Sequence, residues 1–392
     1  MLELLFLLLP IAAAYGWYMG QRSAKKDQDD ISNKLSRDYV TGVNFLLSNQ
    51  TEKAVDLFLD MLQQQESENE IEHHSQFEAE LTLGNLFRSR GEVDRALRIH
   101  QSLERSPKYS FEQKLLAKQQ LAKDFMGVGF FDRAENLYIQ LVDEPEFAQG
   151  ALQQLAIIYQ KTKEWKKAIN VAEKLAKIMP QEDNMELAQY YCEYTKSLSS
   201  QEAKKLLQQA LNISPTCIRA SMLLGQQLID EQDYSNAIPI LENVLNQNPN
   251  YIGEVLSNIK ICYQQLNQLD NYEFFLIKAS QEYKNSTVDL ALAELISKKD
   301  GQSAAQNTIY QQLGRNPSLP LFYRFIEYQI DDAEQGRGRE SLIQLHHLVE
   351  EHLKQSFEYR CINCGYQSHK LIWNCPSCRH WETVNPYQRI EN

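Results

Sequence analysis

Four cysteines near the C-terminal end of the sequence have the residue type and the spacing of a metal site. Cys361 and Cys364 form one C-x-x-C pair, and Cys375 and Cys378 form a second pair after a gap of ten residues. Each pair can place two thiolates on one metal ion, and four sulfurs complete a tetrahedron without an open coordination position. The spacing therefore predicts a closed metal site, which disfavours hydrolytic metal catalysis.

The identity of the metal stays open at this stage, because a tetrahedron of sulfurs accepts both zinc and iron. Both pairs are similar to rubredoxin knuckles, although the gap between them is shorter than a full rubredoxin requires. Residues 357–392 are too few to build much core, so we expect the metal to supply folding energy on the order of 10 kcal/mol. Tyr359, Trp373 and Trp381 are expected to wrap the site or to dock it on the last repeats.

Other residues that could bind a metal or take part in catalysis give weaker signals. His346 and Glu350, like His347 and Glu351, lie one helical turn apart. Either pair could bind a metal, but no third ligand is evident, so a solvated helix face is the better interpretation. The sequence contains no nucleotide-binding, zinc-protease or serine-hydrolase motif, and we predict that the protein is not an enzyme. The cysteines expected to be small buried apolar residues in helices are Cys192, Cys217 and Cys262.

Most of the preceding chain, which must position this module, repeats one unit. The clearest copy spans residues 218–250 and carries Gly225, Ala237 twelve residues later and Pro249 twelve residues after that. Apolar residues on both sides of Ala237 recur at spacings near 3, 4 and 7, which predicts two amphipathic helices joined by a short polar turn. The small side chains at Gly225 and Ala237 allow the helices to approach closely, and Pro249 ends the second helix.

The anchor position of Ala237 recurs at intervals of 42, 38, 34, 35, 34, 34 and 34 residues. The anchor positions are Ala54, Ala96, Ala134, Ala168, Ala203, Ala237, Asn271 and Ala305. A period of 34 residues is that of the tetratricopeptide repeat, and a stack of such hairpins buries apolar faces that one hairpin cannot. We predict an all-α solenoid of these repeats over residues 35–320, a capping helical pair over 321–356, and a rubredoxin-like or zinc-ribbon domain over 357–392.

The first helix of each repeat is expected to line the inner surface of the solenoid, where partner proteins usually bind. Donors and acceptors on such a face suit the backbone of an extended peptide. For any single residue, a solvated helix face is an equal alternative. The polar residues expected on this face are Asn85, Arg88, Gln153, Gln160 and Gln226.

An uncharged stretch near the N-terminal end, residues 4–19, has about the length needed to cross a bilayer core. Basic residues follow it at once, within 22–26, so the positive-inside rule places the rest of the chain in the cytoplasm. A cleaved signal peptide is the alternative, but it would begin with basic residues, and this chain has Glu3 instead. We predict a transmembrane anchor over residues 1–20 and a linker over 21–34.

The formal net charge of the chain is −12, which disfavours a body that binds nucleic acid, since phosphate contacts need a basic face. We therefore predict no nucleic acid as a partner, and no salt-sensitive binding to RNA or DNA. The basic residues scattered around the C-terminal module are Lys354, Arg360, Lys370 and Arg379.

Several blocks of sequence, spread over the whole chain, are similar to one known family. They include MLELLFLLLP at residues 1–10, LSRDY at 35–39, GVNFLLSNQ at 42–50 and LTLGNLFRSRGEVDR at 81–95, and shorter blocks at 12–20 and 359–361. With these blocks the chain resembles the lipopolysaccharide assembly protein B family of Gram-negative bacteria.

The resemblance implies a single-pass protein of the cell inner membrane whose soluble part faces the cytoplasm. It implies an adaptor that modulates lipopolysaccharide levels by helping the membrane protease FtsH degrade the lipid A deacetylase LpxC, and that gathers other lipopolysaccharide-synthesis proteins. It also implies a rubredoxin-like site that binds iron. The alternative hypothesis is an iron-based redox-sensing or electron-transfer protein on a repeat scaffold.

Overall fold

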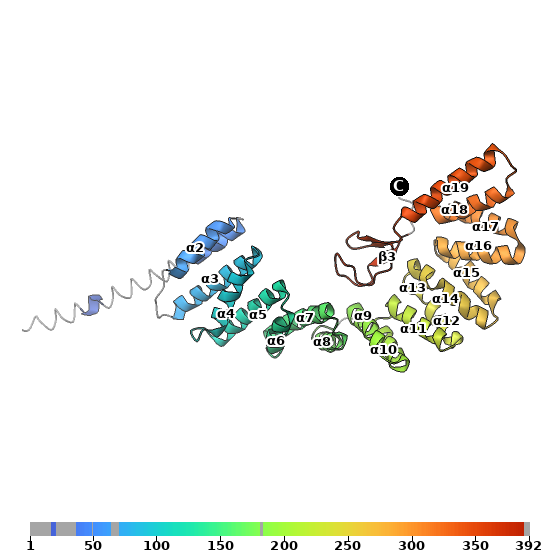
Figure 1. Ribbon diagram of the computed structural model, residues 1–392. Coiled ribbons are helices and arrows are strands. Elements are labelled where there is room, and N and C mark those ends of the chain that lie inside the picture. The colour runs from blue at the N-terminus through green and yellow to red at the C-terminus, as the bar shows by residue number, and fades with distance from the viewer. Residues whose placement is uncertain (1–16, 21–36, 49, 64–69, 181–182, 388–392) are drawn as a thin grey trace, which may run out of the picture. The chain divides into compact units, whose positions relative to one another are not determined.

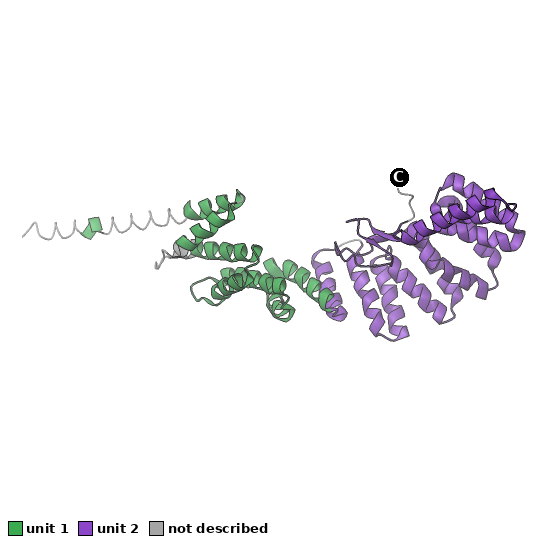
Figure 2. Ribbon diagram, turned by 45° about the horizontal axis from the view of Figure 1, so that its top comes forward, with its two compact units in different colours: residues 1–162 green, residues 163–392 purple. Residues whose placement is uncertain are grey.

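The chain folds into two compact units, residues 1–162 and residues 163–392 (Figure 2). The predicted linker, and the predicted anchor except for its last four residues, lie outside the described residues. No helix within the described part of the chain is both long and apolar enough to cross a membrane. The computed structural model describes residues 17–20, 37–48, 50–63, 70–180 and 183–387.

The first unit is a series of helical hairpins (Figure 1). A helical segment over residues 37–47 precedes the first labelled helix. Each helix packs against the next one in the chain, and α3 also packs against α5, the first helix of the following hairpin. The helices of this unit are α2 (Thr51–Gln63), α3 (Glu70–Ser89), α4 (Val93–Arg105), α5 (Phe111–Val128), α6 (Phe131–Val142) and α7 (Pro145–Thr162).

The second unit is built from the same hairpins and ends in a small sheet (Figure 1). Helices α9, α11, α14, α16 and α18 contact one another in that order, and we call them the first-helix layer. The helices of this unit are α8 (Trp165–Ile178), α9 (Met185–Tyr194), α10 (Ser200–Ile213), α11 (Ile218–Asp230), α12 (Tyr234–Glu242), α13 (Val244–Gln247), α14 (Ile252–Gln265), α15 (Leu269–Glu282), α16 (Ser286–Asp300), α17 (Gln302–Arg315), α18 (Leu319–Asp332) and α19 (Arg337–Gln355), with 3-10 turns η1 (Thr195–Ser197) and η2 (Pro249–Tyr251).

Most of the anchor positions lie in the core of their hairpin. Ala203 is half-buried and Asn271 is exposed. The burial of the anchor position is therefore lost where asparagine replaces alanine and reduced at Ala203. The predicted all-α repeat fold with a small C-terminal module is confirmed. The fully buried anchors are Ala54, Ala96, Ala134, Ala168, Ala237 and Ala305.

The glycines that precede the anchors mark the closest approach of the two helices in a hairpin. A Cβ atom at Gly225 would collide with the side chain of Leu241, which lies one turn after the anchor alanine. A Cβ atom at Gly42 would lie 2.6 Å from Phe58, which occupies the same place in its own hairpin. Glycine at these positions therefore leaves the space that a large apolar side chain fills.

The C-terminal module contains a three-stranded antiparallel sheet with the order β2-β1-β3. Its strands are β1 (Tyr359–Cys361), β2 (Gln367–Ser368) and β3 (Val384–Pro386). The buried core of the module consists of Tyr359, Cys361, Cys375 and Val384. Two of these four residues are predicted metal ligands, so the metal site forms a large part of the core of the module.

Candidate metal centre and its docking on the repeats

Two tight turns of the same kind carry the four cysteines. In the first turn, the N–H of Gly365 donates to the carbonyl oxygen of Cys361 at 2.9 Å. In the second, the N–H of Arg379 donates to the carbonyl oxygen of Cys375 at 2.8 Å. Gly365 and Arg379 both adopt positive φ angles, 77° and 61°, and this left-handed conformation folds each turn back on its sulfurs. Arginine is less suited than glycine to this conformation, so the second turn is held by its surroundings.

The four sulfur atoms are arranged as a metal tetrahedron requires. All four Sγ atoms lie within 4.8 Å of one another. The Sγ atoms of Cys361 and Cys378 are 3.7 Å apart, and those of Cys364 and Cys375 are 3.6 Å apart. With metal–sulfur bonds of about 2.3 Å, a regular tetrahedron has sulfur–sulfur edges of about 3.8 Å. The residues present therefore fit a four-coordinate zinc or iron ion.

Hydrogen-bond donors around the sulfurs lower the thiol pKa of two of the ligands, Cys361 and Cys378. The side chain of Asn363 and the backbone N–H of His380 lower the pKa of the Cys378 thiol to about 5. Burial raises the pKa of the Cys375 thiol to about 11, which is the usual response of a desolvated acid. Because a metal cation favours the thiolate of every ligand, this mixture of surroundings is compatible with four bound thiolates.

The metal module docks on the first-helix layer of the second unit through the carboxylate of the half-buried Glu382. Glu382 accepts hydrogen bonds from the backbone N–H groups of Ile218 at 3.4 Å and Arg219 at 3.0 Å. Nε2 of Gln189 and the thiol of Cys217 donate to the same carboxylate at 2.7 and 3.5 Å. Cys217 occupies the N-cap position of α11 but provides no side-chain cap, so Glu382 caps this repeat helix from the metal module.

Aromatic side chains on both sides complete the interface. Trp373 stacks on Tyr251 with a centroid distance of 5.9 Å and an interplanar angle of 12°. Trp381 meets Tyr190 edge to face, with centroids 6.2 Å apart. Such pairs add about 0.5 to 1.5 kcal/mol each to the burial of their area. The tryptophans therefore dock the module on the repeats, but on α9 and η2 in the middle of the array and not, as the sequence predicted, on the last repeats.

Two hydrogen bonds connect the sheet of the module to the beginning of α14. The hydroxyl of Tyr359 donates to Oε1 of Glu254 at 2.8 Å. The hydroxyl of Tyr251 donates to the carbonyl oxygen of Val384 at 2.9 Å. The module is therefore fixed to α9, α11 and the η2–α14 segment by contacts that lie far apart in the sequence.

Several of these docking residues were not identified from the sequence. Glu382, Gln189 and Tyr251 belong to no motif, and the residues that they join are more than a hundred positions apart. The presence of Trp381 beside Glu382 was the only local signal, since an aromatic residue next to a metal loop often packs on a neighbour. Cys192, Cys217 and Cys262 are buried in the helical repeats, as predicted.

Two of the predicted groove residues contact each other in the first unit. Nη2 of Arg88 donates to Oδ1 of Asn85 at 2.6 Å, and Nη1 of Arg88 donates to Oδ1 of Asp124 at 2.9 Å. Asp124 is fully buried and its other oxygen lies 2.5 Å from Nδ1 of the fully buried His100. Arg88 therefore bridges two neighbouring hairpins. A ligand that binds here would approach a guanidinium group that already has a carboxylate and an amide as hydrogen-bond partners.

The other predicted groove residues lie apart from this pair. On α7 of the first unit, Gln153 is exposed and Gln160 is half-buried. Gln226 belongs to the second unit, where it donates to Asp230 at 2.9 Å and accepts from Asn258 at 3.0 Å. A role in binding a partner stays a prediction for all five residues.

The histidine pairs of α19 are the weaker candidate for a metal site. Among the described residues, the four cysteines are the only group of three or more potential ligands close enough to share a metal. His346 stacks on Tyr323 at 4.2 Å between centroids, and its Nε2 lies 3.5 Å from Glu327. His347 is exposed and lies 3.8 Å from Glu350. That these residues belong to an ordinary helix face stays an interpretation.

Fold and site together define a tetratricopeptide-repeat protein with a C-terminal rubredoxin-type metal-binding module. Residues 359–386 match the family described as "Rubredoxin metal binding domain", and residues 151–186 match the tetratricopeptide repeat. Lipopolysaccharide assembly protein B of Haemophilus influenzae is 72% identical to the chain, and its Escherichia coli K12 counterpart is 46% identical, each over 100% of both chains. The chain belongs to the lipopolysaccharide assembly protein B family.

Solved structures of other repeat proteins are more distant. A tetratricopeptide repeat protein from Parabacteroides merdae has a TM-score of 0.36 and 13% identity, and covers 67% of this chain and 98% of its own. The C-terminal part of a repeat protein from Cytophaga hutchinsonii has a TM-score of 0.38 and 14% identity, and covers 71% of this chain and 96% of its own.

Proposed function

We propose that this protein is a non-enzymatic adaptor of lipopolysaccharide synthesis at the cytoplasmic face of the inner membrane. In this proposal it presents the deacetylase LpxC to the membrane protease FtsH and gathers other lipopolysaccharide-synthesis proteins. Membership of the lipopolysaccharide assembly protein B family supports the pathway. The observation that supports the adaptor role is the docking of the metal module on the repeats, which fixes the module beside the first-helix layer.

The half-life of LpxC in cells with and without the chain tests this proposal. Depletion of an adaptor should lengthen the half-life, because less LpxC reaches the protease. Cys364→Ser should have the same effect, since it removes one metal ligand and with it the docked module. Cys262→Ser changes a buried cysteine of α14 outside the site and is the matched control. An unchanged half-life on depletion would refute the adaptor role.

The proposed anchor, residues 1–20, contributes by confining the adaptor to the membrane that holds the protease. Tethering of this kind raises the effective concentration of two partners to roughly the millimolar range. A chain that begins at Ser23 should remain folded but lose regulation of LpxC. Normal regulation by this shortened chain, at the same cellular level, would contradict the role of the anchor.

We propose iron as the metal, on the basis of the family, with zinc as the alternative that the same sulfurs accept. Elemental analysis of the purified full-length chain decides between them, and Cys364→Ser tests the ligand set. Unchanged metal content in that variant would show that the ligand assignment is wrong.

One observation favours the second candidate function, a redox-sensing or electron-transfer protein. Cys364 is exposed to solvent although the other ligands are buried or half-buried, so an electron donor could approach the metal there. A reversible change in visible absorption on reduction is the expected signature. Full regulation of LpxC by zinc-substituted protein would exclude any need for electron transfer.

A further inference from the structure

A polar pocket lies where α15 ends, α16 begins and α17 ends. Its volume is about 500 Å³, which is within the usual range for sites that hold small molecules. Eight residues line it, and each of them carries a polar or charged side chain. Most small-molecule sites are lined mainly by apolar side chains, so this lining favours a hydrophilic occupant over an apolar one.

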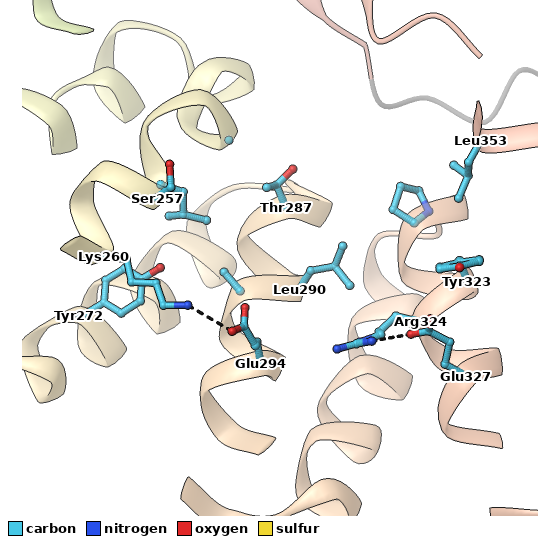
Figure 3. Close-up of a pocket in the computed structure, with 14 residues that line it drawn as sticks. Ser257, Lys260, Tyr272, Thr287, Leu290, Glu294, Tyr323, Arg324, Glu327 and Leu353 are labelled. Atoms are coloured by element: carbon cyan, nitrogen blue, oxygen red, sulfur yellow. Dashed lines mark hydrogen bonds and ion pairs between the residues drawn. The ribbon is translucent and has the colours of Figure 1, made fainter. Parts of the chain in front are cut away.

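The two cations of this pocket have no acidic partner. Neither Lys284 nor Arg315 forms an ion pair with any acidic residue among those that the structure describes, and both residues are exposed. The open groove over α14, α16 and α18 differs, because each cation of its lining is paired, as Lys260 is with Glu294 (Figure 3). Two unpaired cations at the rim of a concave surface create a positive potential there, which attracts an anion.

The inner wall of the pocket is a chain of hydrogen bonds that leaves one acceptor free. Ser280 donates to Oδ1 of the buried Asp289 at 2.6 Å, so the Ser280 oxygen accepts from Nε2 of Gln312 at 3.0 Å. This chain fixes the orientation of the Gln312 amide and turns its oxygen away from Ser280. Gln312 is only 9% exposed, yet its Oε1 accepts no hydrogen bond from any other residue that the structure describes. A buried amide oxygen needs a donor, and a hydroxyl group of the occupant can supply one.

The charged rim and the polar wall define the two ends of one ligand. The lining contains two cations and one acid, Asp289, which gives it a net charge of +1 and favours an anionic end on the ligand. A phosphate group is the best match, because its three oxygens can accept hydrogen bonds from two separate cations at once. The free acceptor in the wall requires a hydroxyl donor at the other end. A compact molecule that combines a phosphate with several hydroxyl groups is a sugar phosphate.

We propose that this pocket binds a small, water-soluble hexose phosphate, whose phosphate is held by Lys284 and Arg315 and one of whose hydroxyls donates to Oε1 of Gln312. The pocket residues come from two successive hairpins, the one that ends in α15 and the one formed by α16 and α17. The bound ligand therefore links these hairpins and stabilises this part of the array against unfolding. The proposal goes beyond the adaptor function, which assigns no ligand to this pocket.

Isothermal titration calorimetry on the full-length chain in detergent tests the proposal, with glucose 1-phosphate and glucose 6-phosphate as the probes. At least one of them should bind at one site per chain, about tenfold or more tightly than inorganic phosphate or glucose does. The same probe should raise the melting temperature of the chain. Lys284→Gln and Arg315→Gln should each weaken its binding about tenfold to a hundredfold, the effect of one hydrogen bond from a charged donor.

Lys177→Gln is the matched control for Lys284→Gln. Lys177 is an exposed lysine in the last turn of α8, in the same unit and outside the pocket, so its loss should leave the affinity unchanged. Gln312→Met removes the free acceptor, so it should lower the affinity for the hexose phosphate to that for inorganic phosphate. Four results would overturn the proposal: no binding of either hexose phosphate, equal affinity of the wild type for inorganic phosphate, tighter binding of a peptide through its C-terminal carboxylate, or full binding by Lys284→Gln and Arg315→Gln.

Discussion

Glu382→Ala should release the metal module from the repeats while the metal stays bound. The substitution removes the cap of α11 and leaves the fully buried side chain of Gln189 without its carboxylate acceptor. Loss of a helix cap costs about 0.5 to 2 kcal/mol, and a buried unpaired donor costs about 1 to 3 kcal/mol. Relief from burying a carboxylate, which raises its pKa, offsets part of this cost. We expect docking to weaken by about 2 to 4 kcal/mol, or roughly 30-fold to 900-fold.

Hydrogen–deuterium exchange of the Ile218 and Arg219 amides measures this effect at the atoms concerned. Both amides donate to Glu382, so they should exchange faster in the variant, while metal content stays unchanged. Glu358→Ala is the matched control, because Glu358 is an exposed carboxylate on the same module. Equal protection of the two amides in wild type and Glu382→Ala would refute the reasoning that this carboxylate holds the interface together.

Three further predictions concern the metal, pH and the repeats. Removal of the metal by a chelator should unfold residues 359–386 and change tryptophan fluorescence, with little loss of helical circular dichroism. Docking contacts that persist without the metal would contradict this prediction. Burial raises the pKa of Glu382, so the docked state binds a proton on this carboxyl group more tightly than the released state does. Docking should therefore weaken as pH rises through that raised pKa. Glu382→Gln should remove this slope, measured on the metal-bound protein so that the metal keeps its ligands as thiolates. An identical slope in the variant would assign it to another group. Gly225→Ala should lower the free energy of unfolding in urea by about 1 to 3 kcal/mol, because the added Cβ meets Leu241. Gly314→Ala is the control, because no atom lies near its Cβ, and it should raise the free energy of unfolding by up to about 1 kcal/mol. Equal effects would show that the close approach of the helices at Gly225 is not needed.

The features that the sequence predicts are those whose partners lie nearby in the chain. The anchor alanines and their glycines contact residues of the same hairpin, and the four cysteines lie within one short module, so periodicity and spacing reveal them. Glu382 and Ile218 are 164 positions apart, and no period connects them. Arg88 is predicted to face the groove, which stays a prediction, and its carboxylate partner comes from the next hairpin, where a single-repeat pattern contains no information on pairing.

The construction of the metal module argues for a structural role of the metal. The three strands of the module contain only three, two and three residues. Two of its four core residues are themselves metal ligands, so the bound metal supplies most of the interactions that hold the core of the module together. The residues that dock it, Trp373, Trp381 and Glu382, lie in or just after the metal loops, so their positions depend on the bound ion. Docking needs only a closed tetrahedron of sulfurs, and zinc forms this as well as iron. An adaptor built in this way should therefore keep both its docked module and the proposed regulation of LpxC after zinc substitution, whereas an electron-transfer protein would lose its activity.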